Sequence, residues 1–257
     1  FRRVLFRSEF CQMAESEIRD AVPDETKEPE KQTQQLPPEE LEQILDAHRT
    51  WLTTNGEQGK RAVLARALLN EAYLQGADLR GADLSMASLQ EAELQLANLF
   101  RANMEEVNLH RAKMFKAEMK GANLQGGNLI EAQMQEVNLQ SASLQRADLR
   151  NADLLECNLR GADLTQAFLS GANLFMGDLR RIQAEEAIFQ EVDLQGGSLK
   201  EANLKRAQLQ DARLAGTDLT GAKLQGADLL DATGLTLDQI KVAEVDEKTR
   251  LPGYLRE

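Results

Sequence analysis

The chain has 257 residues and carries 30 basic and 42 acidic side chains, which gives a formal net charge of −12. This acidity argues against a large phosphate-neutralising surface and hence against direct binding of nucleic acid. The sequence contains no run of about 20 apolar residues, so it predicts no membrane-spanning helix.

Three segments precede the central region. Residues 1–8 match the translation of a common sequencing-adaptor tail, and we interpret them as an artefact. The true N-terminus is then expected to be missing, which leaves a signal peptide or an upstream domain open. Residues 9–38 are rich in Glu, Gln and Pro and predict a disordered acidic tether. One cysteine, Cys11, lies in this tether, and the other, Cys157, lies far from it. We therefore expect no disulfide, and we expect a reducing, cytoplasmic location.

Residues 39–61 have the pattern of an amphipathic helix. Pro37-Pro38-Glu39-Glu40 suits a first turn, and Asn55-Gly56 suits an end. Its apolar face is formed by Leu41, Ile44, Leu45, His48, Trp51 and Leu52. We expect an N-terminal capping helix, because the ends of repeat stacks need covering. A partner-binding helix is the alternative.

A period of five dominates the chain from residue 62 to residue 231. It comprises 34 uninterrupted pentapeptides, in which Leu fills 28 central positions and Ala fills 25 of the positions two residues earlier. An α-helix would rotate successive Leu residues by about 140°, so no apolar stripe could form. The Ala-x-Leu spacing instead sends both side chains to one side of an extended chain. Gly in the last position of ten repeats suits a turn. We expect a coil filled with Leu and Ala.

These repeats resemble the pentapeptide-repeat family, as in ADLRGADLSMASLQ and ADLRNADL. The resemblance implies an all-β solenoid over residues 62–234, a right-handed quadrilateral β-helix of about 8.5 coils with four pentapeptides per coil. Central residues then form the core, and we single out Leu79, Leu84, Leu124, Leu164, Phe189 and Leu219. Ala184 is small for a central position, and we expect Ile182 and Phe189 to fill the space that it leaves.

Residues 235–257 predict a C-terminal cap that contains a short helix and a tail. Thr236 and Gln239 have the spacing of a helical capping box, apolar residues follow to Val245, and Pro252 ends the element. In some members of the family that the repeats resemble, such a helix forms a dimer, so a homodimer is an alternative.

The four-sided arrangement divides the outward charges unevenly. One face carries eight acidic and two basic residues, and the opposite face has a charge of +2. We predict that the acidic face contacts a basic partner through Glu71, Glu91, Glu131, Glu191, Asp211 and Asp231. Solubility alone is the alternative explanation. A second predicted contact site is an apolar patch of Phe115, Leu155, Phe175 and Met176; shielding of coil corners is its alternative.

The sequence does not predict an enzyme, a metal site or a cofactor. Its two histidines, His48 and His110, lie in different elements, and it contains no CxxC, HExxH or phosphate-loop motif. We therefore expect a non-catalytic scaffold with an unknown protein partner. The resemblance adds an alternative, a DNA mimic that binds a type II topoisomerase and confers fluoroquinolone resistance. Weak nucleic-acid binding through the basic face is a second alternative.

Overall fold

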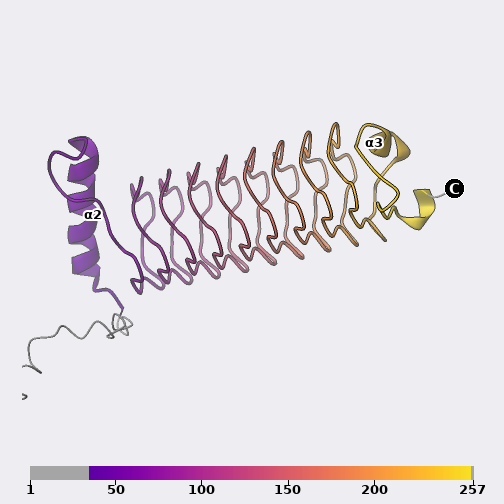
Figure 1. Cartoon of the computed structure of the whole chain (residues 1–257). Helices are drawn as coiled ribbons and strands as arrows, with labels where there is room; N and C mark the ends of the chain where they lie inside the picture. The colour runs from indigo at the N-terminus through magenta and orange to yellow at the C-terminus, as the bar shows by residue number, and fades with distance from the viewer. Residues whose placement is uncertain (1–34, 256–257) are drawn as a thin grey trace, which may run out of the picture. The chain divides into compact units, whose positions relative to one another are not determined.

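The computed structural model describes residues 35–255 (Figure 1). The helices are α2, Pro38–Thr53, α3, Leu237–Lys241, and a 3-10 turn η1, Gly253–Leu255. The predictions made for residues 1–8, for residues 9–34 of the tether and for Cys11 lie outside the described residues. At its end the prediction of a tether over residues 9–38 is wrong, because the Leu36 N–H donates to the Leu68 carbonyl at 2.9 Å and α2 begins at Pro38. No helix within the described part has the length and apolarity that crossing a bilayer would need.

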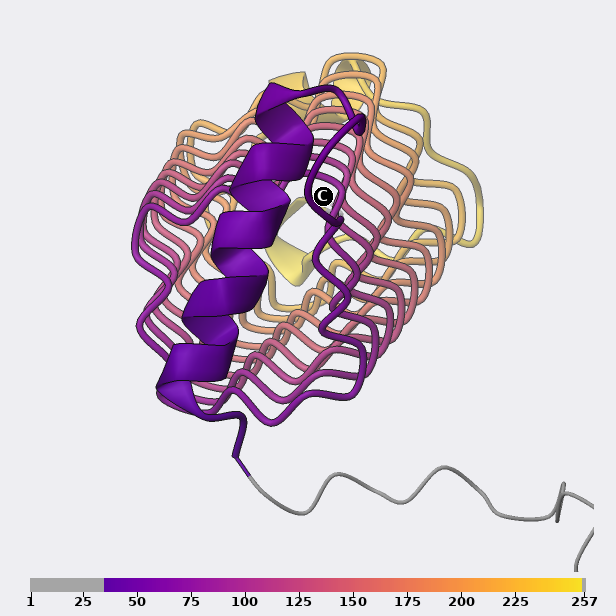
Figure 2. The same cartoon turned by 90° about the vertical axis from the view of Figure 1, so that its left-hand side faces the viewer.

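The repeats form a stack of coils joined by single parallel β-bridges. Each bridge joins residues 20 apart, from Val63 with Asp83 to Arg213 with Thr233. In the first of them the Asp83 N–H donates to the Ala62 carbonyl at 3.0 Å, and the Leu64 N–H donates to the Asp83 carbonyl at 2.7 Å. A separation of 20 residues means four pentapeptides per turn, so the solenoid has four sides. Figure 1 shows the stacked coils from the side, and Figure 2 shows them from the end that α2 crosses.

The interior is filled by the central residue of each repeat and the residue two before it. Phe189 is the largest fully buried side chain, and Ile182 and Ala184 are also fully buried. The other selected core residues are each at most 2% exposed: Leu79, Leu84, Leu124, Leu164 and Leu219. Burial of the apolar side chains is the main force that holds the coil together.

The corners of the coil have a feature that the sequence analysis did not predict. The last residue of every repeat has a positive φ, for example 58° at Glu71 and 67° at Gly76. Only ten of these 34 corners are Gly. The left-handed conformation costs an ordinary L-residue about 1–2 kcal/mol. The corner is therefore imposed by the packing and pairing of the coil rather than by the residue that occupies it.

Helix α2 packs against the first coil. Its residues Leu41 and His48 are buried, and Figure 2 shows the helix crossing the end of the stack. The Ala62 N–H donates to His48 Nδ1 at 3.1 Å, and the Lys60 N–H donates to the Ala47 carbonyl at 3.1 Å. Burial lowers the pKa of His48 below its ordinary value of 6.5, because water no longer solvates the charged form.

The C-terminal segment forms the predicted capping box and a short helix. Thr236 and Gln239 bond reciprocally at the start of α3. The helix ends at Lys241, and Val242 and Val245 lie beyond it with 49% and 41% of their surfaces exposed. The chain then rejoins the ladder, because Glu244 pairs with Lys223 and Arg250 pairs with Asp228. These separations of 21 and 22 residues break the period, so a pattern of fives could not reveal them.

Candidate interaction surface

The six acidic residues selected from the sequence occupy one corner of the coil, and we call them the acidic column. They are Glu71, Glu91, Glu131, Glu191, Asp211 and Asp231, each with φ between 56° and 59°. Asn151 and Gly171 occupy the same corner in the two coils between Glu131 and Glu191. The column therefore consists of two clusters separated by an uncharged gap.

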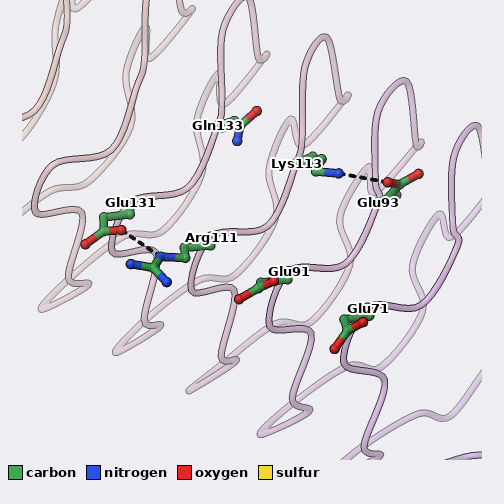
Figure 3. Close-up of a pocket in the computed structure, with 7 residues that line it drawn as sticks. All are labelled: Glu71, Glu91, Glu93, Arg111, Lys113, Glu131 and Gln133. Carbon is green, nitrogen blue, oxygen red and sulfur yellow. Dashed lines mark hydrogen bonds and ion pairs between the residues drawn. The ribbon is translucent and has the colours of Figure 1, made fainter.

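The first cluster borders a shallow depression of about 540 Å³ (Figure 3). Glu71, Glu91 and Glu131 line it together with Glu93, Arg111, Lys113 and Gln133. Arg111 Nε donates to Glu131 Oε2 at 2.7 Å, and Lys113 Nζ donates to Glu93 Oε1 at 2.8 Å, as the dashed lines in Figure 3 show.

Only part of this cluster retains unbalanced negative charge. The Arg111 guanidinium holds the pKa of Glu131 below its ordinary value, because its hydrogen bond and positive charge favour the carboxylate. Glu71 and Glu91 form no salt bridge with any described residue. These two carboxylates are therefore the part of the first cluster that can accept a cation from a partner.

The second cluster consists of Glu191, Asp211 and Asp231, which have no salt-bridge partner within residues 35–255. The acids that flank the acidic column differ from these three, because they have salt-bridge partners. Asp228 pairs with Arg250 at 2.7 Å, and Asp148 pairs with Arg150 at 2.6 Å. The sequence count omitted Arg250, so it overestimated the negative charge of this face.

The opposite face is balanced in part. Asp78 and Asp178 accept hydrogen bonds from Arg80 and Arg180, which lower the pKa of each aspartate. Arg181 pairs with Glu201 at 2.6 Å. The cations without an ion pair among the described residues include Lys120, Arg160 and Lys200. Cations bound to neighbouring carboxylates are poorly placed to neutralise a row of phosphates.

The four residues of the apolar patch do not form one continuous surface. Gln135 stands between Phe115 and Leu155 in their shared column, and the Lys116 ammonium lies over the Phe115 ring at 4.9 Å. Leu155 and Phe175 occupy the same position in adjacent coils, with Met176 next to Phe175 and 55% exposed. The patch therefore consists of Phe115 on one side of Gln135 and of Leu155, Phe175 and Met176 on the other.

Among residues 35–255, no three or more His, Cys, Asp or Glu side chains gather where they could hold a metal ion. Cys157 is buried in the interior, and burial raises the pKa of its thiol. A thiol in such surroundings is a poor nucleophile. His48 is buried at the first coil and stacks on Trp51 with ring centroids 5.6 Å apart. The charged side chains of the acidic column and its neighbours can form ion pairs.

The comparisons with known proteins agree with this architecture. The sequence model of the family described as pentapeptide repeats matches overlapping segments that together span residues 60–233. A search of curated proteins gave no match. HetL, a pentapeptide repeat protein involved in heterocyst differentiation regulation from the cyanobacterium Nostoc sp. strain PCC 7120, has 29% identity and a TM-score of 0.61, over 76% of this chain and 92% of HetL.

Two further solved structures are less similar. A trypsin-treated variant of QnrB1, a plasmid-mediated fluoroquinolone resistance protein, has 15% identity and a TM-score of 0.42, over 73% of this chain and 92% of QnrB1. The pentapeptide repeat protein Rfr23 from the cyanobacterium Cyanothece 51142 has 32% identity and a TM-score of 0.20, over 40% of this chain and 63% of Rfr23. The family match covers most of the chain and agrees with the four-sided register. The chain belongs to the pentapeptide-repeat family and has its right-handed quadrilateral β-helix fold.

Proposed function

We propose that the protein is a non-catalytic scaffold that presents the acidic column to a basic protein partner. The observation that carries this proposal is the unbalanced charge of Glu71 and Glu91, which border a depression in a rigid surface. Carboxylates held one coil apart, about 4.8 Å, form a fixed array that needs little ordering on binding. HetL, which is similar over most of the chain, is involved in the regulation of heterocyst differentiation, and such a role is compatible with an interaction protein.

The remaining segments support this role as parts of a rod. On this proposal the 34 repeats form about 8.5 coils, with α2 at one end and residues 235–257 at the other acting as caps. Caps reduce the length of open β-edge that could join other stacks. Leu155, Phe175 and Met176 supply a secondary apolar contact on another part of the coil.

A matched pair of charge reversals tests the docking face. Glu71→Lys with Glu91→Lys changes the acidic column, and Glu105→Lys with Glu106→Lys changes the net charge equally at another position of the coil. Affinity capture should recover a basic protein with the wild type and the second variant, and lose it with the first. Equal recovery with both variants would contradict the proposal.

The DNA-mimic alternative makes a separate prediction. A topoisomerase-binding mimic should inhibit supercoiling by gyrase at low salt, and reversal of the acidic column should abolish the inhibition. Arg111 and Arg250 reduce the negative charge beside the column, which favours a protein partner of limited footprint over an enzyme that binds along continuous negative charge. Salt-sensitive inhibition that requires Glu71 and Glu91 would replace our proposal with the mimic.

A further inference from the structure

Among the described residues, the first coil has an unpaired backbone edge at Tyr73. In the next coil the equivalent residue, Glu93, is paired: its N–H donates to the Ala72 carbonyl at 3.0 Å, and its carbonyl accepts from the Leu74 N–H at 2.8 Å. Tyr73 has no coil before it. Its backbone N–H and carbonyl form no hydrogen bond with any described residue.

Two other sides of this coil, which contain Ala62 and Ala67, are covered better than the side that contains Tyr73. Ala62 and Ala67 are 1% and 4% exposed, and the Leu36 N–H donates to the Leu68 carbonyl at 2.9 Å. In contrast, the inward residue Ala72 is only partly buried, as is Ala77 on the remaining side. The described residues therefore leave the backbone edge at Tyr73 less covered than the edges beside Ala62 and Ala67.

The pairing pattern of the later coils shows what would fit this edge. Between the first two coils, this side is joined by three backbone hydrogen bonds, which involve the N–H and carbonyl of Glu93 and the carbonyl of Gln95. The same groups of Tyr73 and Gln75 have no backbone partner among the described residues. An extended segment of about five residues could take the place of the missing coil and form the same three bonds.

The charges beside this edge favour a basic segment. Glu71 precedes Tyr73 by two residues, and Glu91 lies one coil further along the same corner. Neither carboxylate has an ion pair among residues 35–255, whereas Glu93 is already bound to Lys113. A Lys or Arg side chain on the added segment could reach the two free carboxylates.

We propose that the Tyr73 edge is a β-augmentation site, at which an extended basic segment of a partner protein pairs with Tyr73 and Gln75. The preference for basic side chains rests on the function proposed for the acidic column. The backbone pairing does not depend on that function.

Substitution of Tyr73 by Pro tests the pairing directly. Proline removes the N–H donor and is tolerated at an edge, and here no described group accepts from that N–H. The variant should therefore unfold within about 1 °C of the wild type. Tyr73→Ala is the matched control, because it removes the ring and keeps the donor. A phage-displayed library of random heptapeptides, selected on the full wild-type chain, supplies the probe peptides.

The proposal predicts that the selected peptides are extended and rich in Lys or Arg. Their affinity should fall at least tenfold for Tyr73→Pro and by less than threefold for Tyr73→Ala. Methylation of one peptide amide nitrogen should weaken binding as much as Tyr73→Pro does. Selection of no such peptide, or equal affinity for Tyr73→Pro, would overturn the proposal. So would slow amide exchange at Tyr73 in the free protein, because the edge would then be occupied already by this chain.

Two charge variants separate this proposal from the previous one. Glu71→Lys with Glu91→Lys should weaken peptide binding, whereas Glu191→Lys with Asp211→Lys, at the distant end of the acidic column, should not. Binding that depends on Tyr73→Pro but on neither charge variant would support the edge and contradict its preference for basic segments. Loss of peptide binding with both charge variants but not with Tyr73→Pro would support binding at the acidic column. It would overturn the proposal that the peptide pairs with the Tyr73 edge.

Discussion

Arg111 and Glu131 occupy the same corner in adjacent coils, and Arg111 Nε donates to Glu131 Oε2 at 2.7 Å. One residue of the acidic column is thus neutralised by a cation that occupies the same corner of the neighbouring coil. The pair is exposed to solvent, so its effect lies more in setting the local charge than in stabilising the fold.

Removal of Arg111 should change how Glu131 titrates. Arg111→Gln should raise the pKa of Glu131 toward its ordinary value of 4.5, because the carboxylate loses its donor and its neighbouring positive charge. In the wild type this pair stabilises the fold at pH values above the ordinary pKa of Glu131. The contribution disappears as the pH falls through the pKa of Glu131 in the folded protein, which lies below that ordinary value. Carboxyl-carbon NMR titration measures the change. The distant substitution Arg150→Gln is the control, and an unchanged Glu131 in Arg111→Gln would contradict the assignment.

The core around Ala184 should show compensation of side-chain volume. Phe189→Ala should reduce the free energy of unfolding by about 3–5 kcal/mol, because it leaves a large cavity. Leu164→Met, a substitution of similar volume in the same core, should reduce it by less than about 1.5 kcal/mol. Denaturant unfolding compares the two.

A double mutant then tests whether Phe189 fills the space beside Ala184. Ala184→Leu alone should destabilise the wild type by about 1–3 kcal/mol through overpacking. In a Phe189→Leu background, Ala184→Leu should reduce the free energy of unfolding by less, because the smaller side chain at position 189 frees volume. Additive effects of the two substitutions would show that the two positions do not share space.

The left-handed corners should tolerate residues according to backbone conformation. Gly81 has a φ of 64°, and a Cβ built there would meet nothing within 4 Å, so packing is not involved. Gly81→Val should lower the free energy of unfolding by about 1–2 kcal/mol. Gly81→Asn should lower it by much less, because Asn enters this region more readily. Equal losses, measured by denaturant unfolding, would show that the corner conformation is not responsible.

The contact of His48 with Ala62 should make the N-terminal end sensitive to mild acid. His48 Nδ1 accepts the Ala62 N–H, so a proton on that atom would break the bond, and burial also disfavours the charged ring. Because the folded pKa lies below the ordinary 6.5, stability is highest above pH 6.5 and falls as the pH drops toward the folded value. The thermal midpoint, followed by the fluorescence of Trp51, the single tryptophan, should therefore decrease as the pH is lowered from about 7.5 to 5.5.

The matched variants assign this loss to one ring. His48→Gln should remove most of the pH dependence in this interval, in which ordinary carboxylates remain ionised. His110→Gln should leave it as in the wild type. A midpoint that falls equally in all three proteins would indicate that His48 does not control the response.

The sequence predicted the repeating part of this structure well, because the inward residues follow a strict period. Leu79 and Leu164 needed only that period to be assigned to the core. The left-handed corners were missed because Glu156 or Arg146 has no intrinsic tendency to adopt a positive φ. The coil imposes that conformation after it forms.

The candidate site was only partly predictable for a related reason. A column can be read from residues 20 apart, so the neighbours of Glu71 and Glu131 followed from the four-sided register. The pairing of Asp228 with Arg250 could not be read in this way, because the C-terminal segment rejoins the ladder out of period. The open edge at Tyr73 also depends on where α2 lies, which no repeat pattern records.

The most direct test of the proposed function is the affinity of the captured basic partner, measured at low and at moderate salt for the wild type and two variants. Our account predicts that affinity falls with salt, that Glu71→Lys with Glu91→Lys weakens it at least tenfold, and that Glu105→Lys with Glu106→Lys leaves it nearly unchanged. Affinity that is independent of salt, or that falls equally with both charge reversals, would contradict docking through the acidic column.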